Sequence, residues 1–142
     1  MRLAIALAER CPPSDTAFSV GAVIVDAAGA ELSRGFSREG DDPVAHAEEA
    51  ALGKLPADDP RLAGATIYST LEPCSQRKSR PRTCTELIIG AGLRRAVIAW
   101  REPDLLVADC QGYELLSAAG TEVTELPEFA AAAAAPNRHL IH

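Results

Sequence analysis

Four side chains in three separated segments place the strongest constraint on how this chain can fold. His46 and Glu48 stand two residues apart, and Cys74 and Cys84 follow much later in the sequence. One imidazole nitrogen and two thiolates form a donor set that holds Zn²⁺ and leaves a fourth coordination position open. A fold that uses this set must bring the three segments together in space.

Glu48 completes this pattern without being a metal ligand. Zinc lowers the pKa of a bound water from 15.7 to roughly 7, so that hydroxide is available at neutral pH. A neighbouring carboxylate can take the proton of this water, deliver it to a ring nitrogen and later protonate the departing amine. The pattern therefore predicts a hydrolytic deaminase that releases ammonia from a cyclic amidine, with Zn²⁺ as cofactor and Glu48 as catalytic residue.

The joint pattern is more specific than its parts. A histidine two residues before a glutamate is common at the start of a helix, and Cys74 alone could be a buried small residue. Together His46, Glu48 and Cys74 have the order of the zinc deaminase signature H-x-E…P-C. The usual P-C-x-x-C spacing would place the last ligand at Arg77. Either Cys84 takes that place across a longer loop, or the metal site is incomplete.

The remaining cysteines and the N-terminal residues indicate a protein of a reducing compartment. Cys11 and Cys110 lack partners at ligand spacing, so we predict structural roles for both. Residues 1–10 are too short and too charged for a membrane span, and an amphipathic helix is expected there rather than a signal peptide. Cysteines in a chain without a secretory signal indicate metal or catalytic thiols. We therefore expect a cytoplasmic protein with no membrane partner.

The order of predicted elements indicates an α/β protein. Residues 19–26 are apolar and β-branched, and a short turn joins them to a second strand as a hairpin. Six consecutive alanines near the end predict a packed helix that Pro136 terminates. Helices are predicted at residues 1–10, 46–52, 83–91, 111–119 and 128–135, and strands at 19–26, 31–36, 65–70, 94–100 and 121–126. The length of 142 residues predicts one domain.

Charge and aromatic content bear on the substrate. The net charge of −6 and the aromatic content of 4% argue against a surface for nucleic acid. Four cations nevertheless lie between Cys74 and Cys84, namely Arg77, Lys78, Arg80 and Arg82. They could clamp the phosphate of a nucleotide-like substrate, with Arg80 and Arg82 as the predicted contacts. The alternative is a solvated loop, or a loop that pairs with carboxylates of a neighbouring subunit.

Several segments together resemble the cytidine-deaminase-like superfamily, and most of all the deaminase domain of the bifunctional pyrimidine deaminase/reductases of riboflavin biosynthesis. The resemblance spans nearly the whole chain, and the long gap between the two cysteines is its most specific mark. The segments that carry it are residues 20–25, 46–48, 70–75, 84–89, 118–123 and 137–140.

The resemblance implies a three-layer α-β-α fold with a central mixed five-stranded sheet. It implies that His46, Cys74 and Cys84 bind Zn²⁺, that Glu48 moves protons, and that residues 1–142 form one deaminase domain without a reductase. It also implies a homo-oligomer, dimer or tetramer. Implied substrate contacts come from Phe18, Ser37, Ala47 and Gln76; Ser37 and Gln76 stand where the riboflavin-pathway enzymes carry histidines.

Three functions remain open. The first is a zinc-dependent deaminase of a phosphorylated pyrimidine, such as the diamino-ribosylamino-pyrimidinone phosphate of riboflavin biosynthesis, or of another nucleoside or nucleobase such as cytidine or deoxycytidylate. The second is a nucleic-acid deaminase, which the acidic charge opposes. The third is a noncatalytic zinc module, which gives no reason to retain Glu48. Trp100 could stack on a substrate base, or it could pack a helix against the sheet.

Overall fold

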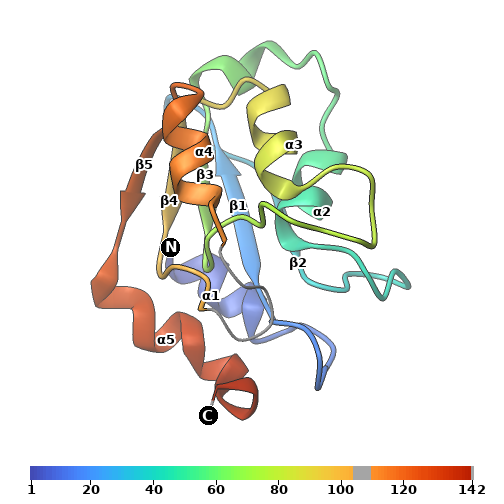
Figure 1. Ribbon diagram of the computed structural model, residues 1–142. Helices are drawn as coiled ribbons and strands as arrows, with labels where there is room; N and C mark the ends of the chain where they lie inside the picture. Colours follow the sequence, from blue (N-terminus) through green and yellow to red (C-terminus); the bar gives the residue numbers. More distant parts are fainter. Residues whose placement is uncertain (104–109, 142) are drawn as a thin grey trace.

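The computed structural model describes residues 1–103 and 110–141, which form one mixed five-stranded sheet between helices (Figure 1). The order of the strands is β2-β1-β3-β4-β5. The strands are β1 (Gly21–Val25), β2 (Glu31–Phe36), β3 (Thr66–Ser69), β4 (Arg95–Ile98) and β5 (Glu122–Glu125). The main helices are α1 (Arg2–Ala8), α2 (Ala47–Gly53), α3 (Cys84–Gly90), α4 (Gly112–Ala118) and α5 (Ala130–Ala134), with a 3₁₀ turn η1 at Pro60–Gly64. The predicted α/β class and mixed sheet are confirmed.

The sheet is antiparallel at one edge and parallel at the other. β1 pairs antiparallel with both β2 and β3, whereas β3, β4 and β5 run parallel. The hairpin between β1 and β2 turns at Asp26, whose Oδ1 accepts from the N–H groups of Ala28 and Ala30, both at 2.9 Å. Gly29 in this turn has φ +86°, a conformation that favours glycine. The predicted hairpin is thus confirmed.

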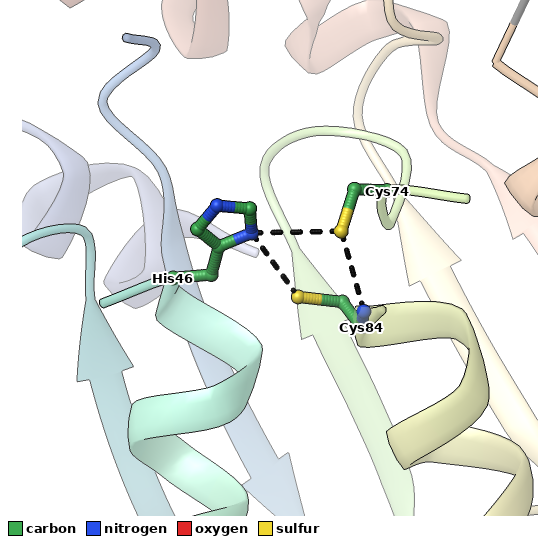
Figure 2. A group of neighbouring side chains, drawn as sticks. All are labelled: His46, Cys74 and Cys84. Carbon is green, nitrogen blue, oxygen red and sulfur yellow. Dashed lines mark hydrogen bonds between the residues drawn. The ribbon is translucent and has the colours of Figure 1, made fainter. Parts of the chain in front are cut away.

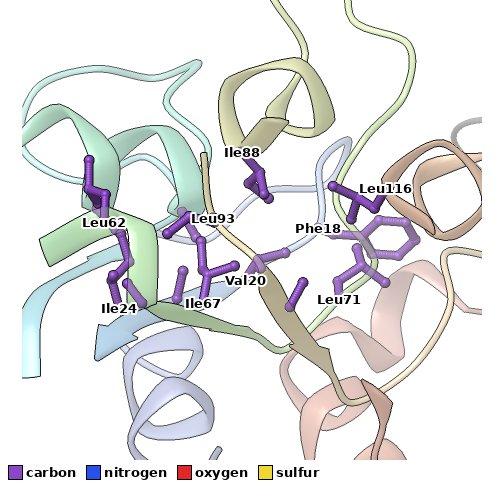
Figure 3. Packing of buried hydrophobic residues seen from close by; sticks show 14 residues of the cluster. Phe18, Val20, Ile24, Leu62, Ile67, Leu71, Ile88, Leu93 and Leu116 are labelled. Carbon is purple, nitrogen blue, oxygen red and sulfur yellow. The ribbon is translucent and has the colours of Figure 1, made fainter. Parts of the chain in front are cut away.

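Helices cover both faces of the sheet, as expected of a three-layer protein. α2, α3 and α4 lie on one face, and α1 and α5 lie on the other (Figure 1). The larger core forms under the first group, where Ile24 and Ile67 of the sheet meet Ile88 of α3 and Leu116 of α4 (Figure 3). Within residues 1–103 and 110–141, no helix has the length and apolar character needed to cross a bilayer.

The alanine-rich C-terminal segment differs from its prediction. Its α-helical part, α5, covers only Ala130–Ala134, between the 3₁₀ helices η2 (Pro127–Phe129) and η3 (Ala135–Leu140). Pro136 lies in the first turn of η3, where its missing N–H leaves no hydrogen bond unmade. The predicted end of the α-helix just before Pro136 is confirmed, but the chain continues beyond it as a 3₁₀ helix, which was not predicted. The prediction of a packed segment is confirmed, because Ala133 is fully buried in a cluster with Ile5 and Ala99.

The helix that carries Glu48 sits directly on a glycine of β2. A Cβ atom added at Gly35 would lie 2.5 Å from the Ala47 carbonyl oxygen and 2.6 Å from the Ala51 nitrogen, both of α2. Since backbone atoms cannot yield as side chains do, we expect Gly35→Ala to lower the free energy of unfolding by about 1–3 kcal/mol. Urea denaturation measures this change.

Gly53, at the end of α2, provides the matched control. Nothing lies within 4 Å of a Cβ added there. Gly53→Ala should leave stability unchanged or raise it by up to about 1 kcal/mol, because alanine favours helix. Equal stability of Gly35→Ala and wild type would show that α2 does not depend on this close approach.

Candidate metal centre and its pocket

The fold brings His46, Cys74 and Cys84 together from three elements (Figure 2). His46 is the N-cap of α2, Cys74 follows β3, and Cys84 is the first residue of α3. His46 Nδ1 lies 3.5 Å from Cys74 Sγ and 3.4 Å from Cys84 Sγ. All three donor atoms lie within 4.8 Å of one another. The long loop thus places Cys84, and not Arg77, beside the other two candidate ligands.

These separations fit a tetrahedral zinc ion. With Zn–S bonds of about 2.3 Å and Zn–N bonds of about 2.0–2.1 Å, tetrahedral angles hold sulfur and nitrogen roughly 3.5 Å apart. In the described part of the chain, no fourth His, Cys, Asp or Glu joins the group. A three-donor set of this kind is characteristic of catalytic rather than structural zinc.

Electrostatics favour a thiolate at one of the two sulfurs, that of Cys74. A hydrogen bond from the Cys84 thiol, together with contacts from His46 and from the Cys84 N–H at 3.2 Å, lowers the pKa of Cys74 to about 4. The same thiol contact raises the pKa of Cys84, because its proton is shared with a thiolate. Burial lowers the pKa of His46, but hydrogen bonding to Cys74 and its charge outweigh burial and raise it. One thiolate is therefore present at neutral pH.

Glu48 is buried beside this group, and burial raises its pKa. Ser69 Oγ lies 2.7 Å from Glu48 Oε1 and 2.8 Å from the Leu71 carbonyl oxygen. When Glu48 is ionised, the Ser69 hydroxyl can donate to it. When Glu48 is protonated, Glu48 can donate to Ser69 Oγ while Ser69 donates to Leu71. Both protonation states of Glu48 therefore have a partner, as a group that moves protons requires.

A cavity of about 670 Å³ opens at this group. His46, Glu48 and Cys74 line it. Four of the substrate contacts that the resemblance implies also line it, namely Phe18, Ser37, Ala47 and Gln76. The Ser37 hydroxyl accepts from Val20 N at 2.9 Å, so that it ties the start of β1 to the end of β2.

Three other predicted substrate contacts do not line the cavity, namely Arg80, Arg82 and Trp100. Arg80 forms ion pairs with Asp42 and, at 3.3 Å, with Glu49. Arg82 donates to the Glu86 carbonyl oxygen at 3.3 Å, over α3. Trp100 packs on the core in an edge-to-face contact with Phe18, with ring centroids 6.0 Å apart. None of the three is among the residues that line the cavity in the described part of the chain.

The cavity contains polar residues that sequence reasoning missed. Arg38 has a positive φ of 58°, and its guanidinium donates to the carbonyl oxygens of Pro12 and Phe18 and to Ser19 Oγ. It therefore holds the loop that precedes β1. Burial raises the pKa of Glu102 to about 7. No local pattern marks either residue, because their partners lie far away in the sequence.

Comparison with known proteins places this site in a family. Residues 1–100 match the family described as "Cytidine and deoxycytidylate deaminase zinc-binding region". The chain is 45% identical over 120 residues to the diaminohydroxyphosphoribosylamino-pyrimidine deaminase of Schizosaccharomyces pombe, and this covers 83% of the chain and 29% of the relative. It is 38% identical over 127 residues to the riboflavin biosynthesis protein RibD of Aquifex aeolicus, covering 87% and 33%.

Comparison with solved structures finds the same kind of relative as comparison of sequences. The diaminohydroxyphosphoribosylaminopyrimidine deaminase/5-amino-6-(5-phosphoribosylamino)uracil reductase of Thermotoga maritima superposes with a TM-score of 0.76 at 31% identity, over 96% of this chain and 37% of that one. The chain thus spans about a third of the length of the relatives it matches. This chain belongs to the family defined by the cytidine and deoxycytidylate deaminase zinc-binding region.

Proposed function

We propose that the chain is a zinc-dependent hydrolytic deaminase that releases ammonia from a phosphorylated pyrimidine, such as the diaminohydroxyphosphoribosylaminopyrimidine for which its relatives are named. One observation carries this proposal. Glu48, which is not in the three-donor group, lines the same cavity as His46 and Cys74.

His46, Cys74 and Cys84 would hold the zinc ion. When bound, zinc acts as a Lewis acid that makes a hydroxide nucleophile available near neutral pH. Glu48 would accept a proton from the attacking water and deliver it to the ring nitrogen beside the attacked carbon. It would then accept the second proton, from the hydroxyl group now on that carbon, and transfer it to the leaving amine, so that the carbonyl forms as the C–N bond breaks. Ser69 would keep the Glu48 carboxyl group oriented throughout, because it is a partner of both protonation states. Phe18 lines the cavity and would exclude water from one side of the ring.

A phosphate on the substrate would meet the loop between the two cysteines. Lys78 lines the cavity, and none of the described carboxylates forms an ion pair with it. The guanidinium of Arg80 is engaged with Asp42 and Glu49, and Arg82 lies over α3. We therefore place the phosphate contact at Lys78, with Arg80 and Arg82 contributing long-range positive charge at most.

A panel assay of ammonia release tests the proposal. The panel contains the phosphorylated diaminopyrimidine and its dephosphorylated form, cytidine, deoxycytidylate, guanine, adenosine and a short single-stranded oligonucleotide. We expect the phosphorylated diaminopyrimidine to have the highest kcat/KM. Lys78→Met should raise its KM and leave the KM of the dephosphorylated form unchanged. Absence of ammonia from every compound would contradict the proposal.

Deoxycytidylate or cytidine is the second candidate substrate. The matched family carries both names in its description, and Phe18-Ser19-Val20-Gly21 resembles the corresponding segment of cytidine deaminases. A higher kcat/KM with either compound than with the diaminopyrimidine would select this candidate.

The domain, its location and its assembly are further proposals. One continuous sheet from residue 21 to residue 125 supports a single deaminase domain. None of the four cysteines, all in the described ranges, forms a disulfide, which supports a reducing compartment such as the cytoplasm. Ile89 on α3 and Leu115 on α4 are exposed apolar side chains that an interface between copies of the chain would cover. Sedimentation at micromolar concentration tests this last point, and a species of 14.9 kDa alone would contradict it.

A further inference from the structure

The loop between the two candidate sulfur ligands sends one buried arginine to the start of α2. The Arg77 side chain is only 2% exposed. Its Nη2 donates to the Val44 carbonyl oxygen at 2.7 Å and to Glu49 Oε1 at 2.9 Å, and its Nε donates to Ser79 Oγ at 3.0 Å. Removal of a partner from so deeply buried a charge is costly, because the remaining ion cannot recover its hydration.

Glu49 joins this arginine to the candidate metal ligand His46. Its Oε1 accepts from the His46 backbone N–H at 3.4 Å as well as from Arg77, and its Oε2 accepts from Arg80 Nε at 3.3 Å. Val44, whose carbonyl oxygen also accepts from Arg77, precedes His46 by two residues. The backbone on both sides of His46 is therefore anchored to the loop that begins after Cys74 and ends before Cys84.

This anchorage matters because few contacts hold the His46 ring itself. A metal-binding histidine usually donates its second ring N–H to a carboxylate or carbonyl, and this fixes the ring. Here Nδ1 faces the two sulfurs, and within the described ranges no hydrogen bond reaches Nε2. The His46 side chain does meet the backbone of Glu49 in the capping box that begins α2. The imidazole is therefore positioned by the first turn of α2, which Glu49 and Arg77 anchor.

We propose that Arg77 and Glu49 are positioning residues that hold His46 in register with Cys74 and Cys84, and so set the zinc affinity of the site. This inference rests on the proposed function, since it requires these three residues to be zinc ligands.

Zinc affinity, measured by competition with a chromogenic chelator, tests the inference directly. We expect Arg77→Met and Glu49→Gln each to raise the zinc dissociation constant by roughly 10–100-fold. The double variant should bind zinc about as weakly as the weaker of the two single variants. The two effects do not add, because both changes break the same contact between Arg77 and Glu49. Arg77→Lys should fall between wild type and Arg77→Met, since an ammonium retains the charge but cannot span Glu49, Val44 and Ser79 together.

An exposed pair of the same kind supplies the control. Arg34 donates two hydrogen bonds to Glu31, at 2.8 Å and 2.6 Å, on the surface of β2 and away from the cavity. Arg34→Met should leave the zinc dissociation constant within about twofold of wild type, as expected of an exposed pair. The visible spectrum of the Co²⁺-loaded proteins should change in the Arg77 and Glu49 variants and not in this control.

The outcomes separate the alternatives. A raised KM with unaltered zinc affinity would make Arg77 a substrate contact and overturn the inference. A lowered melting temperature with unaltered zinc affinity and Co²⁺ spectrum would reduce the pair to a stability role and also overturn it. Wild-type protein that binds no stoichiometric zinc would instead refute the proposed function. Should Arg77→Met not fold, Arg77→Lys and Glu49→Gln carry the same comparison.

Discussion

Replacement of Glu48 by glutamine is expected to lower kcat by roughly 10²–10⁴-fold, the usual contribution of a positioned acid and base. Glutamine has nearly the same shape and can still accept from Ser69, so the fold and the cavity should be retained. Glu48 is outside the three-donor group, and one zinc ion per chain should therefore remain bound. Ammonia release and the zinc content of the purified protein measure the two effects.

An exposed glutamate controls for the loss of charge. Glu122→Gln, on β5, should leave both kcat and zinc content unchanged, since its side chain is 73% exposed and remote from the cavity. Full turnover by Glu48→Gln would remove Glu48 from the mechanism. Loss of zinc from Glu48→Gln would indicate that Glu48 is a ligand and not a proton carrier.

Replacement of Cys84 by serine is expected to weaken zinc binding by on the order of 10²–10³-fold and to abolish turnover. Zinc sites with four protein ligands bind the ion with a free energy of about 10–16 kcal/mol, so each donor contributes roughly 3 kcal/mol of it. Serine is nearly isosteric with cysteine, and the fully buried position in α3 should tolerate it. Chelator competition measures the affinity, and circular dichroism checks the fold.

Cys11→Ser is the matched control for this change. Cys11 is half-buried and donates to the Val20 carbonyl oxygen at 3.5 Å, a contact that a serine hydroxyl can replace. Its zinc affinity and activity should equal those of wild type. Stoichiometric, tightly held zinc in Cys84→Ser would mean that the long spacing from Cys74 does not supply the third ligand, and that another group completes the site.

Much of the fold could be predicted because its signals are local. The apolar, β-branched run before Asp26 gives β1, and β2 has the predicted bounds, Glu31–Phe36. The other element boundaries differ by a few residues, since hydrogen bonding at helix and strand ends depends on neighbours that a linear pattern does not contain. The α-helix ends before Pro136 as predicted, but the 3₁₀ helix η3 that contains this proline has no local signal in the sequence.

The basic loop shows where local chemistry stops being informative. Four cations between two cysteines indicate a site for an anionic ligand. The sequence does not show which of these cations already form ion pairs with carboxylates of the same chain. Asp42 and Glu49, each more than 25 residues away, engage Arg80 and Arg77. Arg77 and Lys78 both line the cavity, and of these two only Lys78 has no ion pair with a described carboxylate. Arg38 and Glu102 were missed for the same reason.

The types of donor, their order and the accompanying acid follow from the amino acids alone, because a metal's preference for nitrogen and sulfur is a property of single side chains. That Cys84 stands beside Cys74, that Ser69 is a partner of both protonation states of Glu48, and which arginines are already paired become evident only in the folded chain. Those facts depend on distances between segments far apart in the chain, which the packing of α2 and α3 on the sheet sets.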